Sequence, residues 1–167
     1  GPLAHTHAEQ NTFNIAYKGK RLFYNSGYRP WMGAPHTLAW YKHTQGHNGI
    51  LVDQYGQPYD AGAYGFLPRF IDGEHLTYAV GDASHAYEAH ELPSRSRKDN
   101  TPNDMEVKFF RRHYLLIRPN LFIVYDEMEA NKPVDWSWLI HNYHGLKLNA
   151  ENKTVETTYD DRGGRVT

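Results

Sequence analysis

The chain has 167 residues and a formal net charge of −1, and it is 40% hydrophobic and 22% charged. This length suits one ordinary domain with its own core, and the composition excludes a disordered chain. The charge balance argues against bulk binding to nucleic acid or an anionic membrane, and no run approaches the roughly 20 apolar residues of a membrane-spanning helix. The absence of Cys excludes disulfides, thiolate metal sites and Cys nucleophiles. The 11 His, which bind metals and transfer protons near neutral pH, are therefore the first candidates for chemistry.

Short β-rich segments recur along the chain with turn residues between them. In chain order we expect strands at 12–17, 21–25, 49–53, 64–71, 75–80, 107–117, 121–127, 134–142 and 147–159. Lys18-Gly19 and Asp72-Gly73 are typical hairpin turns. Strands at this spacing predict an all-β fold, an antiparallel β-sandwich.

Two stretches lack the alternation of a strand. The polar segment 91–104 is interpreted as a connection, and the segment 27–46 as a long functional loop. Tyr28 and Tyr41 lie in this loop. A Tyr beside a cation can act as a general acid or base, although most of the 13 Tyr must be structural.

The first candidate site is the His5-x-His7 pair near the start of the sequence. In an extended strand, residues i and i+2 face the same way, so both imidazoles would project together. Such a pair suits a shared metal ion, or one metal ligand beside one acid/base group. The alternative is two polar side chains near a terminus without a common role.

A further His stands directly before the predicted strand 49–53. His47 is a candidate metal ligand there, or a side chain that caps the strand. Asn25, at the end of the second predicted strand, is a candidate neighbour, although an amide is a weak metal ligand. A site of His7, Asn25 and His47 would be of the N/O type, for which zinc is the best match.

Charged residues interrupt the otherwise apolar strand 107–117. Alternation puts Arg111 and His113 on one face and Arg112 on the other. A cationic face suits binding of a uronate carboxylate or a sulfate, because guanidinium makes bidentate contacts. The alternative is an exposed face with ion pairs to residues such as Asp126.

Aromatic residues leave two interpretations open, since Trp is common both in sandwich cores and as a platform on which sugars stack. Trp40 and His141 are therefore further candidates for substrate binding.

Three ordered motifs resemble the heparinase II/III-like polysaccharide lyases. The run HTHAEQNTF is similar to the family signature His-x-His-Ala-Asp-Gln-Asn-Ser-Phe, and LFYNSGY is similar to a strand that ends in Asp-Ser-Gly-Tyr. The run WYKHTQGHNGILVD is similar to the segment Thr-x-Ala-His-Asn-x-Ile-x-Val-Asp. These runs occupy 5–13, 22–28 and 40–53, and the later strands also fit at 110–113 and 123–126.

The resemblance implies that 1–167 is the β-sandwich domain of a longer enzyme, and both ends of the sequence look like cuts through it. An N-terminal (α/α) toroid would complete the active site. His5 matches the catalytic His of the family, and His7 and His47 match ligands of a structural zinc ion. Asn25 stands where the family usually has an Asp, which puts the ion in doubt because an amide carries no charge.

The resemblance also implies the activity. The enzyme would cleave an acidic, uronate-containing polysaccharide by β-elimination, in a secreted or periplasmic bacterial location. Alginate is favoured because the loop 27–46 is most similar to exolytic alginate lyases, while heparin or heparan sulfate, chondroitin and ulvan remain open. Neither nucleic acid nor a membrane is an expected partner.

Two other function classes compete with this interpretation. A non-catalytic carbohydrate-binding sandwich would use Trp31, Trp40 or Trp138 as a platform and would not need the three His. A metal-dependent glycan hydrolase would use His7, His47 and a carboxylate, and would leave saturated products.

Overall fold

The structure is a computed structural model that describes residues 7–27, 31, 34–58, 62–88, 105–159 and 162–167. The strands are β1 (Ile15–Tyr17), β2 (Lys20–Phe23), β3 (Ile50–Val52), β4 (Phe66–Asp72), β5 (Leu76–Asp82), β6 (Val107–Ile117), β7 (Leu121–Ala130), β8 (Trp136–Trp138), β9 (Lys147–Asn149), β10 (Thr154–Tyr159) and β11 (Arg162–Val166). The short helices are η2 (Thr37–Tyr41), η3 (Thr44–Gly46) and η4 (Ser84–Tyr87). In these described segments, no helix is both long and apolar enough to cross a membrane.

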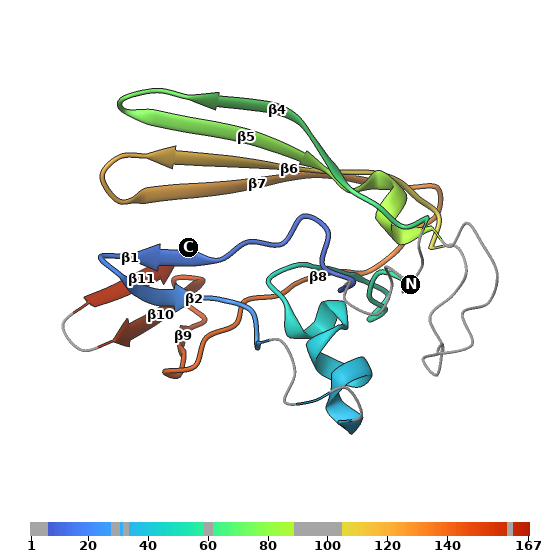
Figure 1. Cartoon of the computed structure of the whole chain (residues 1–167), viewed down its shortest axis with the longest axis horizontal. Coiled ribbons are helices and arrows are strands. Elements are labelled where there is room, and N and C mark those ends of the chain that lie inside the picture. Colours follow the sequence, from blue (N-terminus) through green and yellow to red (C-terminus); the bar gives the residue numbers. More distant parts are fainter. Residues whose placement is uncertain (1–6, 28–30, 32–33, 59–61, 89–104, 160–161) are drawn as a thin grey trace.

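The strands form antiparallel sheets in two layers. The order β4-β5-β6-β7 makes a four-stranded sheet, which lies above the hairpin β1–β2 and the sheet β11-β10-β9 in Figure 1. The short pair β3–β8 forms a further antiparallel sheet, and β8 also lies below the four-stranded sheet in Figure 1. The prediction of an antiparallel all-β domain is therefore confirmed.

Turn chemistry explains where the strands begin and end. Lys18 and Gly19 have φ angles of 47° and 76°, which suit the tight turn between β1 and β2. The predicted strand 147–159 is in fact two strands, because the chain turns between β9 and β10, where Lys153 has a φ of 51°. The predicted strand 134–142 is shorter, and only Trp136–Trp138 pairs with β3.

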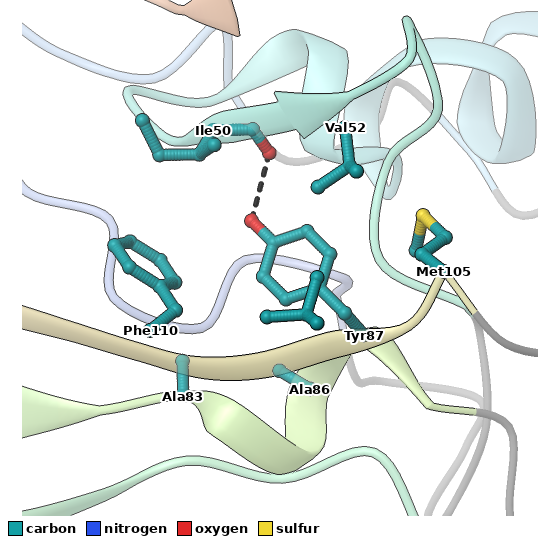
Figure 2. Packing of buried hydrophobic residues seen from close by; sticks show 8 residues of the cluster. Ile50, Val52, Ala83, Ala86, Tyr87, Met105 and Phe110 are labelled. Atoms are coloured by element: carbon teal, nitrogen blue, oxygen red, sulfur yellow. Dashed lines mark hydrogen bonds between the residues drawn. The ribbon is translucent and has the colours of Figure 1, made fainter. Parts of the chain in front are cut away.

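The main apolar core joins β3 to the four-stranded sheet. Figure 2 shows Tyr87 of η4 reaching across the core, where its hydroxyl donates to the carbonyl oxygen of Ile50 at 2.8 Å. Burial raises the pKa of Tyr87, so the hydroxyl stays protonated as a donor. The buried members of this cluster are Ile50, Val52, Ala83, Ala86, Tyr87, Met105, Val107 and Phe110. This packing fixes β3, and with it the residues that directly precede β3.

A cavity of about 1100 Å³ opens between the two layers. Its lining is largely apolar and includes Phe13, Leu22, Leu116, Phe122, Ile140 and Val166. Trp138, a platform candidate of the carbohydrate-binding alternative, is part of the lining, but none of the predicted catalytic, substrate-binding or metal-ligand residues of the lyase is. The candidate chemistry therefore lies elsewhere in the domain.

We predict that Tyr87→Phe lowers the free energy of unfolding by about 1–3 kcal/mol, because it leaves the buried Ile50 carbonyl without this donor. Urea unfolding of the 167-residue chain measures the change. Tyr143→Phe is the matched control, since Tyr143 is 69% exposed. Equal stability of the two variants would contradict the role of the hydroxyl.

Candidate functional site

The segment that carries the first His motif is held by contacts with distant parts of the chain. Ala8 donates its N–H to the Lys42 carbonyl at 2.9 Å. The side chain of Gln57 makes two bonds with the backbone of Gln10, accepting from its N–H at 2.8 Å and donating to its carbonyl at 2.9 Å. Residues 7–9 are not in a strand, so these contacts, and not strand alternation, orient His7.

Three side chains converge beside η3. The rings of His7 and His47 lie with their centroids 5.4 Å apart. Glu9 lies between them, with Oε2 2.8 Å from Nδ1 of His47 and Oε1 3.8 Å from Nδ1 of His7. One ligand atom from each residue lies within 4.8 Å of the other two, so the group could hold a metal ion.

His47 is buried and oriented by its second ring nitrogen. Nε2 lies 3.1 Å from the carbonyl oxygen of Tyr41, at the end of the π-helix η2. A carbonyl only accepts, so Nε2 carries the proton. Nδ1 is the nitrogen turned to Glu9: it donates to Oε2 when both ring nitrogens are protonated, and it is the nitrogen left for a metal ion when only Nε2 is protonated.

Glu9 is ionised despite its partial burial. Burial favours the neutral carboxyl, but the hydrogen bond with His47 and the charges of His47 and His7 outweigh it, so the pKa of Glu9 lies below its ordinary value. A carboxylate at this place supplies the negative charge that a cation site needs.

A close backbone approach positions the start of this cluster. Gly46 has no side chain, and its neighbours leave no room for one. A Cβ there would lie 2.6 Å from the Trp40 carbonyl oxygen and 2.7 Å from Oγ of Ser26. The Gly46 carbonyl accepts the N–H of Ser26 at 2.9 Å. This contact joins the end of the β2 segment to η3, directly before His47.

Asn25, the predicted third ligand, lies beside the cluster. Its Nδ2 donates to Oε2 of Glu9 at 3.3 Å, and its Oδ1 accepts the N–H of Asn48 at 3.1 Å. The structure thus brings together His7, Asn25 and His47, and adds Glu9 among them.

Arg112 connects the cluster to the four-stranded sheet. Its side chain is fully buried and makes two bonds with Asp126, at 2.6 Å and 2.8 Å. Its Nη1 donates to the carbonyl oxygens of Asn11 at 2.7 Å and Asn48 at 3.1 Å. One guanidinium therefore ties the segment after Glu9 to the residue after His47.

The predicted substrate-binding residues fall into two places. Arg111 and His113 lie on the face of the sheet opposite Arg112, as alternation predicts. Arg111 pairs with Asp82 at 2.9 Å, and His113 lies between the Tyr78 hydroxyl at 2.7 Å and Glu127 at 3.2 Å. These side chains are separated from the His cluster by the sheet itself.

Trp40 and His141 lie on the side of the cluster. Their rings meet edge to face with centroids 6.0 Å apart, and Trp40 is 39% exposed. His141 donates its backbone N–H to Oδ1 of Asn48 at 2.7 Å, and burial lowers the pKa of its ring. A partly exposed indole beside a neutral imidazole suits contact with a sugar ring.

The other predicted residues differ in what can be said of them. Tyr41 contributes its carbonyl to His47, and its half-buried ring lies near Gly27. His5 and Tyr28, predicted to be catalytic, lie outside the described residues.

Two residues of this site, Glu9 and Asn48, were missed in the sequence. Glu9 continues the alternation of His5 and His7, so the pattern His-x-His-x-Glu was a signal for a ligand. Arg112 was correctly placed on the face opposite Arg111, but the expected ion pair with Asp126 is buried on that face and not on an exposed one. Asn48 gave no signal beyond its place next to His47.

The whole sequence matches one known family. The profile described as Heparinase II/III-like, C-terminal covers residues 1–166. No curated protein sequence matches the chain.

Solved structures show the same fold. The heparan sulfate lyase HepC from Pedobacter heparinus is 17% identical, with a TM-score of 0.67 over 94% of this chain and 22% of that chain. A heparinase III gene product is 14% identical, with a TM-score of 0.65 over 92% of this chain and 21% of that chain. The chain thus spans about a fifth of the length of these structures.

We predict that the two neighbouring arginines differ in their effect on stability. Arg112→Met should lower the free energy of unfolding by about 3–5 kcal/mol, because it leaves Asp126 as an uncompensated buried charge. Arg111→Gln is the control and should cost at most about 1 kcal/mol, because its side chain is 50% exposed. Urea unfolding of both variants of the chain is the measurement, and similar losses would refute the contrast.

Proposed function

The chain belongs to the heparinase II/III-like family, as its C-terminal domain, and on this premise we propose that it is part of a polysaccharide lyase that cleaves an acidic polysaccharide by β-elimination. The observation that carries the proposal is the approach of Tyr41 to the cluster of His7, Glu9 and His47, through the bond between the Tyr41 carbonyl and His47. The segments that contribute these residues are the ones whose motifs resemble the family.

The reaction sets three chemical requirements. A base removes the proton on C5 of a uronate, an acid protonates the C4 oxygen as the C4–O bond breaks, and the carboxylate of the enolate-like transition state must be neutralised. The product carries a C4–C5 double bond. Because the chain spans about a fifth of its solved neighbours, we propose that an N-terminal toroid domain supplies the remaining groups.

Tyr41 and His5 are our candidates for proton transfer in this domain, with Tyr28 as a further candidate. Tyr41 is the last residue of η2, and its backbone carbonyl accepts from the buried His47, so its backbone is anchored beside the cluster. His5 enters through the resemblance and precedes His7 by two residues. The partly exposed Trp40 and its neighbour His141 are candidates for contacting the sugar that is cleaved or the one next to it.

We propose that the residues His7, Glu9 and His47 hold a zinc ion. The donor set fits, since two imidazole nitrogens and a carboxylate oxygen lie within 4.8 Å of one another and match the N/O ligands that zinc takes. The carbonyl of Tyr41 also fixes the second nitrogen of His47, as metal-binding His residues require. When bound, the ion would hold the Tyr41 segment and the first His motif together.

The substrate remains a choice among uronate polymers. Alginate is our first choice from the loop 27–46, and heparan sulfate is the polymer that the solved neighbour's name carries. A secreted or periplasmic location would suit a polymeric substrate that does not cross a membrane.

One observation favours a second function class. Two His and one Glu are also the ligands of hydrolytic zinc enzymes, in which the metal activates water. A metal-dependent glycan hydrolase would give saturated ends, so the product distinguishes it from a lyase.

We predict that the full-length enzyme forms ultraviolet-absorbing unsaturated ends from one member of a panel of uronate polymers, and that the 167-residue chain alone forms none. Tyr41→Phe should lower kcat by about 100-fold or more, because it removes the phenolic proton and keeps the ring. Tyr17→Phe, in the hairpin β1–β2, is the matched control and should retain parent activity. Saturated products, or an unaffected Tyr41→Phe enzyme, would sink this assignment.

For the metal, we expect Glu9→Gln to weaken zinc binding by about 100-fold or more, because the loss of a charged ligand exceeds the 10–100-fold effect of outer contacts. Chelator competition measures the affinity. Glu129→Gln is the control, since Glu129 is a half-exposed residue paired with Lys108. Unchanged affinity in Glu9→Gln would remove Glu9 from the site.

A further inference from the structure

We propose that Asn25 is a positioning residue: its side-chain amide holds the Glu9 carboxylate beside His47 and is not itself a metal ligand. This inference rests on the proposed metal site, which it deepens by dividing the roles of ligand and support between Glu9 and Asn25.

The hydrogen bonds decide which end of the Asn25 amide faces the cluster. The backbone N–H of Asn48 can only donate, so the Asn25 atom that lies 3.1 Å from it is the oxygen. The other end, the NH₂ group, is then turned to Oε2 of Glu9 at 3.3 Å. An NH₂ group has donors only, so the face that Asn25 presents to the cluster stabilises an anion and cannot bind a cation.

Asn25 is itself held by a rigid part of the molecule. Asn48 is fully buried, and each of its polar groups has a partner. Besides the bond to Asn25, its carbonyl accepts from Arg112 at 3.1 Å, its Nδ2 donates to the Phe13 carbonyl at 2.9 Å, and its Oδ1 accepts the N–H of His141 at 2.7 Å. These bonds fix the position of Asn48, so its backbone N–H holds the side-chain oxygen of Asn25 in one place.

Glu9 needs this support because its side chain is 38% exposed. Oε2 alone receives both the His47 contact at 2.8 Å and the Asn25 bond. A Glu side chain regains conformational freedom when it is released, which opposes its confinement beside His47. Without the amide, the carboxylate would exchange its place beside His47 for positions in water.

The test is a double-variant cycle on zinc affinity, measured by chelator competition with the full-length protein. Asn25→Ala should lower the affinity by about 10–100-fold, as removal of an outer contact does. In the Glu9→Gln background, Asn25→Ala should have almost no further effect, because the carboxylate that Asn25 supports is gone. Independent losses that multiply would overturn the proposal, since they would mean that Asn25 acts on the ion directly.

Matched measurements separate this role from a loss of stability. Asn131→Ala, at an exposed position, should leave zinc affinity unchanged. A purely structural effect of Asn25→Ala would lower the unfolding transition equally in both backgrounds and would not produce the coupling in zinc affinity.

The outcomes also distinguish this proposal from the proposed function. Coupling in zinc affinity without any unsaturated product would overturn the lyase and leave the positioning role in place. Activity without zinc binding would overturn the proposed metal site. The same double-variant cycle would then be measured in kcat, where independent losses that multiply would overturn the role of Asn25. A protein that neither binds zinc nor forms unsaturated product overturns both.

Discussion

The buried pair of Arg112 and Asp126 is the interaction on which the candidate site depends. A guanidinium with no exposed surface is costly unless its hydrogen bonds are satisfied, and here each of its bonds has a structural use. Two go to Asp126 on β7, and Nη1 goes to the carbonyls of Asn11 and Asn48. The rings around the guanidinium are Phe13, Phe110 and Trp138, at 5.5, 5.3 and 5.9 Å. The charge thus draws two irregular segments onto a regular sheet.

The cluster itself lies on segments without regular sheet pairing. His7 and Glu9 are outside any strand, and His47 lies between η3 and β3. Such segments carry function when a rigid scaffold positions them. Here the scaffold works through polar groups of the loops, chiefly the Gln57 bonds to Gln10 and the Asn48 bonds described above. The geometry of the cluster therefore depends on hydrogen bonds that are distant from it in sequence.

The four-stranded sheet separates two polar regions. One face carries Arg112 and faces the cluster, while the other carries Arg111 and His113 with partners of their own. The charged groups of the second region are paired within the domain, as Asp82 shows. Burial favours its neutral form, yet hydrogen bonds from Ser84 and Arg111 outweigh burial and hold its pKa below the ordinary value. Trp40 and the His cluster thus lie on one side of this sheet, and Arg111 lies on the other.

The sequence by itself determined the fold class and the identity of the ordered His motifs. Hairpin signals and alternation are local, so strands such as β6 were predicted with their observed bounds, and the resemblance at 5–13 and 40–53 predicted that His7 and His47 belong together. Only the tertiary structure decided which carboxylate joins them. The hydrogen bonds that hold the Glu9 segment beside His47 join residues that lie 36 to 47 positions apart in the sequence. Asn25 turns its NH₂ group to Glu9 because the backbone N–H of Asn48 holds its side-chain oxygen. Periodicity reports which residues share a face, but the partner of a polar side chain depends on how distant segments pack.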